Sequence, residues 1–399
     1  MTMLSIVIPA YNEENGIEEI MRRVLAVRPA LAEVGVNEME LLVVNDGSRD
    51  RTAEVAQQVA GDDSGVRIIS HPKNRGYGAA LKTGFAQANG ELVGFLDADG
   101  TYPPEHFPQL CVEALKGADL VIGSRMAGAE SRMPVTRRIG NVIFATLLSV
   151  LGWQRVTDSA SGMRVFRKDV LRKISPLPDG LNLTPVMSTR AVHEGIKMVE
   201  VPIPYSERVG RSKLSVIRDG RIFLQSMVWT VLTYNPVRVL GILGLIGTGI
   251  AGLIALGLVI ARLSGVTSLG PWGVAALFTA LVMGVIGISL FALGATFNYL
   301  VSLFYEAPVR QGLFGKPVFK NPLENNFGWM GVVSFIAGFL VGLISLISGA
   351  SGGDISRLWF WMLGGAELTL VGVQLIIYWI LMRVLDDLSQ REVLIEKDM

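Results

Sequence analysis

Four long apolar runs in the second half of the chain constrain its fold more than any other feature. They cover residues 240–261, 272–305, 329–348 and 358–382. Each run is long enough to cross the hydrocarbon core of a bilayer as a helix, and the second is long enough to tilt or to extend beyond it. The first half of the chain mixes charged and apolar residues as a globular domain does. We therefore expect a soluble domain followed by a membrane domain of four helices over 238–385.

The charges that flank the apolar runs predict the orientation of the helices. Basic residues follow the second and the fourth run, at Arg310, Lys316, Lys320 and Arg383. The remaining two connections carry only Asp354 and Arg357. Because cytosolic loops collect Lys and Arg, we expect the N-terminal domain and a tail over 386–399 in the cytosol, at the inner membrane if the cell is prokaryotic. A single cysteine, Cys111, and an N-terminus without a signal-peptide pattern agree with that compartment.

The soluble half alternates short apolar runs with helical patterns. Strands are expected over 4–9, 40–44, 66–69, 91–96 and 118–123, and helices over 17–31, 52–59, 77–88 and 105–115. This order predicts an α/β domain over 1–214, with a Rossmann-like, mostly parallel sheet covered on both faces. Ligands of such sheets bind at the carboxyl ends of the strands. The net charge is +1 and no basic tract is interleaved with aromatics, so nucleic acid is not expected as a partner.

Two segments have the composition of helices that lie on a membrane surface. Residues 134–153 begin with basic side chains and continue as an uncharged run that is too short to span a bilayer. Residues 215–237 mix apolar and charged side chains and lead into the first apolar run. Both can lie in the interface with their basic residues toward the head groups. The alternative for both is an amphipathic helix that faces the protein core.

Asp97 and Asp99 stand where the fourth expected strand ends and a turn begins. Side chains two residues apart on an extended segment point to the same side, so both carboxylates can approach one hard cation such as Mg²⁺ or Mn²⁺. An ordinary turn is the alternative, because Asp followed by Gly is common turn chemistry. The position of the pair at the ligand-binding edge of the sheet favours a cation held against a diphosphate.

A series of motifs resembles a known family. These are Ile8-Pro-Ala-Tyr-Asn-Glu-Glu14, Val43-Val-Asn-Asp-Gly-Ser48, Asn74-Arg-Gly, Asp97-Ala-Asp99 and Gly123-Ser-Arg125. In this order they resemble family 2 glycosyltransferases of the GT-A fold. With Asp158-Ser-Ala-Ser-Gly-Met-Arg164 and the Tyr205 to Lys213 segment, the likeness is to polyprenyl-phosphate hexose synthases of the dolichol-phosphate mannose synthase type. The motif match covers about residues 4–235.

The resemblance implies a role for individual residues. Nucleotide-sugar binding falls to Pro9, Ala10, Tyr11, Glu13, Val44, Asp46, Asp97, Ala98, Asp99 and Arg125, and catalysis to Asp99, Arg125 and Asp158. Metal binding falls to Asp97, Asp99 and Thr101, where Thr101 replaces a Gln found in some members. Arg137, Arg138, Arg208 and Lys213 are expected to bind the acceptor phosphate.

The implied activity is inverting transfer of a hexose from a nucleotide sugar to polyprenyl or dolichyl phosphate at the cytosolic membrane face. GDP-mannose is the favoured donor and UDP-glucose the alternative. A processive polysaccharide synthase is a further alternative, although the chain lacks a Gln-x-x-Arg-Trp motif. A non-catalytic flippase or scaffold is another, and the intact Asp97 and Asp99 pair argues against it.

Two features of the membrane half bear on helix packing. Gly338 and Gly342 have the spacing that lets helix backbones approach closely, either within one chain or in a homo-oligomer. Glu367 lies near the middle of the last apolar run, where an ionised carboxylate is costly. Pairing or protonation in a helix interface is the expected state of Glu367, with transport as the alternative.

Overall fold

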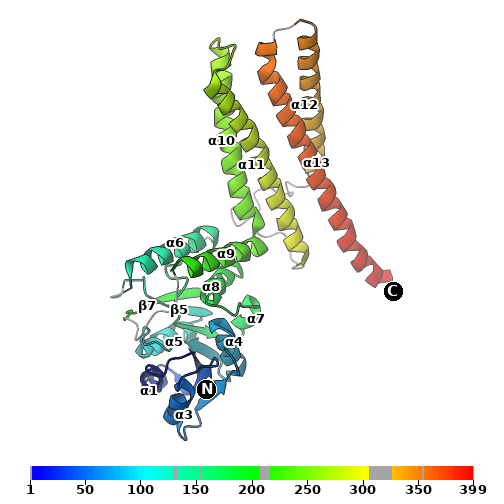
Figure 1. Ribbon diagram of the computed structural model, residues 1–399. Coiled ribbons are helices and arrows are strands. Elements are labelled where there is room, and N and C mark those ends of the chain that lie inside the picture. Colours follow the sequence, from blue (N-terminus) through cyan, green and yellow to red (C-terminus); the bar gives the residue numbers. More distant parts are fainter. Residues whose placement is uncertain are drawn as a thin grey trace. The chain divides into compact units, whose positions relative to one another are not determined.

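The computed structural model describes residues 2–128, 133–152, 154–206, 216–304, 326–352 and 355–398. The chain divides into two compact units, Met1–Val231 and Leu232–Met399 (Figure 1).

The first unit is built on one seven-stranded sheet. Its strands are β1 (Thr2–Ala10), β2 (Val36–Asn45), β3 (Val66–Ser70), β4 (Leu92–Phe95), β5 (Leu120–Ser124), β6 (Arg164–Arg167) and β7 (Met198–Pro202). The order across the sheet is β3-β2-β1-β4-β6-β5-β7, and all neighbours are parallel except β6, which runs antiparallel to β4 and β5. The five expected strands and the mostly parallel sheet are confirmed. Strands β6 and β7 were not expected.

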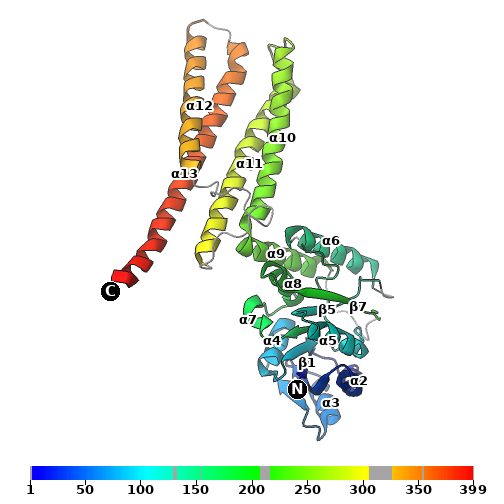
Figure 2. The same cartoon turned by 180° about the vertical axis from the view of Figure 1, so that it is seen from behind.

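Helices cover both faces of this sheet (Figures 1 and 2). One face carries α1 (Ile17–Ala26), α2 (Arg28–Glu33), α3 (Thr52–Ala60), η1 (Pro104–His106) and α5 (Phe107–Leu115); the other carries α4 (Tyr77–Gln87), α7 (Val170–Ile174) and α8 (Leu183–His193). Alternation along β1 produces this division, because Ile6 and Ile8 belong to one buried cluster and Val7 to the other. Because both faces of the sheet are covered by apolar packing, the polar residues of the strand-end loops lie at the edge of the sheet.

The helix expected over 17–31 is two helices. α1 ends at Ala26, and α2 begins at Arg28 with a proline, Pro29, in its first turn. Proline is tolerated in the first turn of a helix, but in a helix interior it removes a backbone hydrogen bond and clashes with the preceding turn. Pro29 therefore starts a new helix instead of continuing the first.

α6 (Val135–Gly152) and α9 (Val216–Tyr234) lie side by side in the first unit. Phe144 of α6 and Phe223 of α9 have ring centroids 6.1 Å apart. Leu148 and Met227 share a small buried cluster below them. Each helix also has apolar side chains on its outer surface, among them Ile139 and Ile143 of α6 and Leu224 and Trp229 of α9. Both helices thus have one apolar face in the protein and one exposed.

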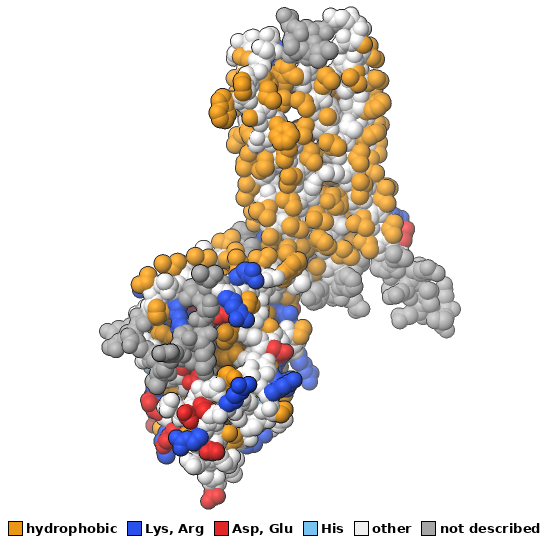
Figure 3. All heavy atoms as spheres, viewed as in Figure 1, with side chains coloured by type: hydrophobic (Ala, Val, Ile, Leu, Met, Phe, Trp, Pro, Cys, Tyr) orange, Lys and Arg blue, Asp and Glu red, His pale blue; other side chains and the backbone are white. Residues whose placement is uncertain are grey.

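The second unit consists of four long apolar helices. They are α10 (Pro236–Leu263), α11 (Pro271–Phe304), α12 (Phe327–Ala350) and α13 (Ile355–Asp398), and each has the length and composition to cross a membrane. Hydrophobic side chains cover the visible surface of this unit (Figure 3). The four expected apolar helices are confirmed by length and composition, and α13 continues as one helix through the expected tail to Asp398. Arg310, Lys316, Lys320 and Asp354, on which the orientation depends, lie outside the described residues.

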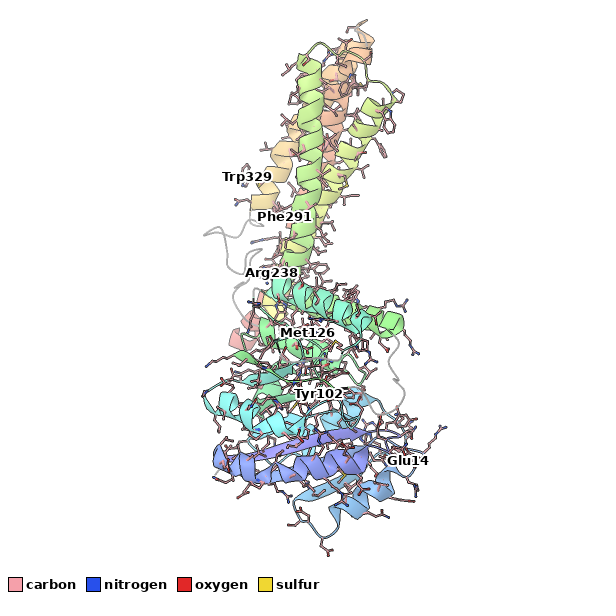
Figure 4. The ribbon with its side chains drawn as sticks, turned by 90° about the vertical axis from the view of Figure 1, so that its left-hand side faces the viewer. Glu14, Tyr102, Met126, Arg238, Phe291 and Trp329 are labelled. Atoms are coloured by element: carbon pink, nitrogen blue, oxygen red, sulfur yellow. The ribbon has the colours of Figure 1, made fainter. Side chains whose placement is uncertain are left out.

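Glycines bring the helices of this unit into close contact. A Cβ at Gly244 of α10 would lie 2.7 Å from the backbone nitrogen of Phe291 in α11, which Figure 4 labels. A Cβ at Gly338 of α12 would lie 2.5 Å from the backbone nitrogen of Thr369 in α13. Gly338 therefore serves packing within the chain, and a homo-oligomer remains a prediction. Glu367 of α13 lies against Gly284 of α11, a position in a helix interface.

Candidate active site

A cavity of about 540 Å³ lies at the carboxyl ends of the strands in the first unit. It brings together residues that follow β1, β2, β4 and β5. The expected site residues that line it are Pro9, Ala10, Tyr11, Glu13, Asp46, Asp97, Ala98, Asp99, Thr101, Arg125 and Arg137. Val44 is instead buried in the sheet, Arg138 is not among the lining residues, and Asp158 lies buried behind Arg125. Arg208 and Lys213 lie outside the described residues.

Asp46 anchors the loop that leads into α4. Its Oδ1 accepts hydrogen bonds from the His71 ring (2.7 Å) and the Arg75 amide (2.9 Å), and its Oδ2 accepts one from the Gly76 amide (2.8 Å). Gly47 makes the approach possible, because a Cβ there would lie 2.5 Å from the Lys73 carbonyl carbon. Asp46 was expected to bind the base or ribose. In the structure most of its hydrogen-bonding capacity organises the cavity wall.

Asp97 and Asp99 both line the cavity and are half-buried. The Tyr77 hydroxyl donates to Asp97 Oδ1 at 2.8 Å, and the Thr101 amide and hydroxyl donate to Asp99 Oδ1 at 3.1 and 2.6 Å. Thr101, expected as a metal ligand, is here a partner of Asp99.

The donor set at this point fits a divalent cation. Two carboxylates that line one cavity, each with a hydroxyl donor on one oxygen, are the hard oxygen ligands that Mg²⁺ and Mn²⁺ take. The described residues contain no group of three or more His, Cys, Asp or Glu side chains that could hold a metal ion, so no third side chain of these types joins Asp97 and Asp99.

Arg125 is held by a buried ion pair. Its Nε and Nη2 donate to the two oxygens of Asp158, both at 2.7 Å, and its backbone amide donates to Asp158 Oδ2 at 3.0 Å. Burial favours the neutral form of each group, but the pair outweighs burial, so the pKa of Asp158 is lowered and that of Arg125 is raised. Both groups are therefore charged at neutral pH.

Two tyrosines complete the surroundings of Arg125. The guanidinium carbon lies 5.8 Å from the ring centroid of Tyr102 and 5.4 Å from that of Tyr205, and Tyr102 is labelled in Figure 4. These distances allow a cation–π attraction. Asp158 and the two rings together restrict the guanidinium to one orientation at the cavity wall.

Several of these partners were not found from the sequence. The sequence assigned no site role to His71, Tyr77 or Tyr102. Glu200 of β7 accepts from the amides of Thr157 and Asp158, and so fixes the loop that carries Asp158. These partners are far apart in sequence, so no spacing rule detects them. Only the Tyr205 motif carried a signal, through the resemblance.

The opposite side of the cavity is formed by α6 and α9. Arg137, Asn141 and Phe144 line it from α6, and Gly220 and Phe223 from α9. The cavity therefore has carboxylates at the strand ends, while the helices contribute the aromatic rings of Phe144 and Phe223 together with Arg137 and Asn141.

Sequence comparisons extend over both halves of the chain. The profile described as glycosyl transferase family 2 matches residues 5–175, and a domain of unknown function, DUF8752, matches residues 236–396. A dolichyl-phosphate hexose transferase of Haloferax volcanii is 33% identical over 56% of this chain and 92% of its own length. An undecaprenyl-phosphate 4-deoxy-4-formamido-L-arabinose transferase of Pseudomonas aeruginosa is 32% identical over 78% of this chain and 89% of its own.

Among solved structures, glucosyl-3-phosphoglycerate synthase of Mycobacterium tuberculosis, in a complex with Mn²⁺ and UDP, aligns with a TM-score of 0.45. Its identity is 23%, over 58% of this chain and 80% of that one. The two relatives match over nearly their whole length at above 30% identity, and the cavity motifs from residues 8–14 to residues 158–164 fall within the matched profile. This chain belongs to glycosyl transferase family 2.

Proposed function

We propose that this protein transfers a hexose from a nucleotide sugar to a polyprenyl phosphate at the cytosolic face of a membrane. The observation that carries the proposal is the double character of the cavity. Asp46, Asp97 and Asp99 line one side, while Phe144 and Phe223 line the other beside Arg137. A polar donor and an acceptor with a phosphate head and an apolar tail fit these two sides. The names of the two relatives support the same acceptor class.

The strand-end loops would bind the donor. Pro9, Tyr11 and Glu13 would border the nucleoside, on the wall that Asp46 holds in place. Asp97 and Asp99 would hold Mg²⁺ or Mn²⁺, which neutralises charge on the diphosphate as it leaves. Arg125 would add a fixed positive charge beside the same group, since Asp158 and two aromatic rings orient it.

The acceptor would supply its own nucleophile. A phosphate monoester has a second pKa near 6, so its oxygen is ionised at neutral pH and needs no strong general base. This oxygen attacks the anomeric carbon, the bond from that carbon to the diphosphate oxygen breaks, and its electron pair leaves with the nucleoside diphosphate. Attack opposite the leaving group inverts the configuration. Arg137, which lines the cavity, would bind the incoming phosphate, with Arg138, Arg208 and Lys213 as further candidates.

The sugar is the finer part of the proposal. The resemblance favours GDP-mannose, with UDP-glucose as the alternative. A third donor class enters from the relative named for 4-deoxy-4-formamido-L-arabinose, because that match covers 78% of this chain. This sugar is a pentose derivative, so its transfer would support the acceptor class and replace the hexose in the proposal.

A donor panel tests the proposal. Full-length protein is incubated with Mn²⁺ or Mg²⁺, a short polyprenyl phosphate and labelled forms of the three donors. We expect one donor to give a lipid-extractable, acid-labile product that carries a single sugar. Asp99→Asn should abolish transfer and leave the protein folded, whereas Asp62→Asn, at an exposed carboxylate, should retain it. A long polymer, or no turnover with any donor, would refute the proposal.

A further inference from the structure

Two residues enclose the Asp97 carboxylate from two sides. The family resemblance implied no role in metal binding for either of them. One is Tyr77, the first residue of α4, and the other is Gly162, in the loop before β6. Both line the cavity with Asp97. They approach the carboxylate from segments far apart in the chain, so the fold itself creates the enclosure.

Tyr77 engages one oxygen of the carboxylate. Its hydroxyl donates to Asp97 Oδ1 at 2.8 Å. The start of α4 is itself fixed, because the Ala79 amide donates to the Asp179 carbonyl at 3.1 Å. The backbone at Gly78 lies so close to the Pro178 carbonyl that a Cβ could not be accommodated. The hydroxyl therefore comes from a rigid element.

Gly162 closes the other side. A Cβ at this position would lie 2.6 Å from Asp97 Oδ2 and 2.9 Å from Asp97 Oδ1. The loop is held near the carboxylate, since the Gly162 amide donates to the Tyr102 hydroxyl at 2.7 Å and the Ser161 hydroxyl donates to the Gly123 carbonyl at 2.5 Å. Any side chain at position 162 would push the carboxylate away.

We propose that Tyr77 and Gly162 are positioning residues that fix the Asp97 carboxylate in the orientation that binds the divalent cation. This rests on the metal role of Asp97 in the proposed function. A ligand that is held before the cation arrives loses little conformational freedom on binding, and groups that orient a ligand typically contribute 10- to 100-fold to metal affinity.

Titration with Mn²⁺ alone tests the inference without turnover. Full-length protein in detergent is titrated with Mn²⁺ and the electron paramagnetic resonance signal of the free ion is followed. We expect Tyr77→Phe, which removes one oxygen atom, to weaken Mn²⁺ binding roughly 10-fold or more. Gly162→Ala should weaken it from the other side while the Tyr77 hydroxyl remains. Tyr299→Phe, which loses the same atom in α11, is the matched control and should bind Mn²⁺ as the wild type does.

The double variant separates a shared target from two unrelated defects. If both residues act on one carboxylate, the losses of Mn²⁺-binding free energy in the two single variants do not add in Tyr77→Phe/Gly162→Ala. The Mn²⁺ affinity of the double variant should then be close to the lower of the two single-variant affinities. Excess Mn²⁺ should then restore turnover in Tyr77→Phe with little change in KM for the donor. If one single variant shows no thermal unfolding transition and is therefore not folded, the Mn²⁺ affinity of the other single variant tests the inference.

Wild-type Mn²⁺ affinity in both single variants would overturn the inference, even if sugar transfer to polyprenyl phosphate is observed. A wild-type protein that binds Mn²⁺ but transfers no sugar would refute the proposed function and leave the positioning roles standing. A wild-type protein that binds no Mn²⁺ would overturn the inference, whereas the proposed sugar transfer is decided by the donor panel.

Discussion

At the scale of single residues, the site is made of pairs whose members come from different loops. Asp158 was expected to be catalytic, yet its carboxylate is fully buried and both of its oxygens accept from Arg125. In the proposed function, Asp158 would therefore act only through the guanidinium it orients. The charge that faces the cavity belongs to Arg125.

This pairing predicts a large effect of Asp158→Asn on stability. The variant leaves the Arg125 charge buried without its counter-ion, which should lower the free energy of unfolding by about 3–5 kcal/mol. Arg125→Met/Asp158→Leu removes both charges and should be more stable than Asp158→Asn. Thermal denaturation of the three proteins measures the difference. A double variant less stable than Asp158→Asn would contradict the argument from buried charge.

The same pair predicts a pH dependence. The pKa of Asp158 lies below the ordinary aspartate value of 3.8, so the unfolded state binds the proton more tightly than the folded state. The contribution of the ionised Asp158 carboxylate to the free energy of unfolding is therefore complete above pH 3.8 and is lost as the pH falls through the pKa of the folded state. The difference in Tm between wild type and Asp158→Asn should stay constant down to about pH 5 and narrow below about pH 4. A difference that already narrows near pH 6 would mean that another group titrates.

The carboxylates at the strand ends could be predicted from sequence because they depend on local pattern. Asp97 and Asp99 follow an apolar run, and that position alone puts them at the ligand-binding edge. Their partners could not be predicted in this way. The hydroxyl on Asp97 comes from Tyr77 and the imidazole on Asp46 from His71, and both contacts exist only once β-strands and helices have packed.

At the scale of elements, the sequence pattern predicted five strands and missed β6 and β7. β4 is as short as β6 but is apolar and uncharged throughout, whereas β6 has an arginine at each end and directs Val165 toward one core cluster and Phe166 toward the other. The antiparallel place of β6 between β4 and β5 is set by the sheet. Proline gave a clearer local signal, although the expected single helix over 17–31 overlooked Pro29.

The outer apolar face of α6 predicts contact with lipid. In a Cys111→Ala background, Ile143→Cys places a thiol on that face, where the native side chain is 56% exposed. Leu115→Cys on α5 is the matched control, with a native exposure of 45%. In liposomes we expect a water-soluble maleimide to label position 115 but not position 143. Equal labelling at both positions would leave α6 in water and favour another role for its exposed face.

At the scale of the whole molecule, hydropathy alone predicted four membrane helices, because the spanning runs are long and nearly free of charge. The packing of these helices against one another could not be predicted from hydropathy. The spacing of Gly338 and Gly342 could serve one chain or two, and the close approach of Gly338 to α13 was visible only in three dimensions. The charge-based orientation remains a prediction.

We expect both ends of the chain in the cytosol. A green fluorescent protein fused after Met399 should fluoresce, since it folds poorly when exported by the general secretory route, and alkaline phosphatase at the same position should be inactive. Alkaline phosphatase inserted near Ser264, between α10 and α11, should be active. The reverse pattern would invert the proposed topology and place the cavity on the outer side.

The shared cavity also has a consequence for inhibition. The strand-end carboxylates and the apolar side chains of α6 and α9 line one continuous space of about 540 Å³. A compound that joins a diphosphate mimic to a short alkyl chain could occupy both sides at once. The second contact would then form at the high effective concentration that a short tether provides. Such a compound should bind more tightly than either half, and detergents with long single tails should compete with it.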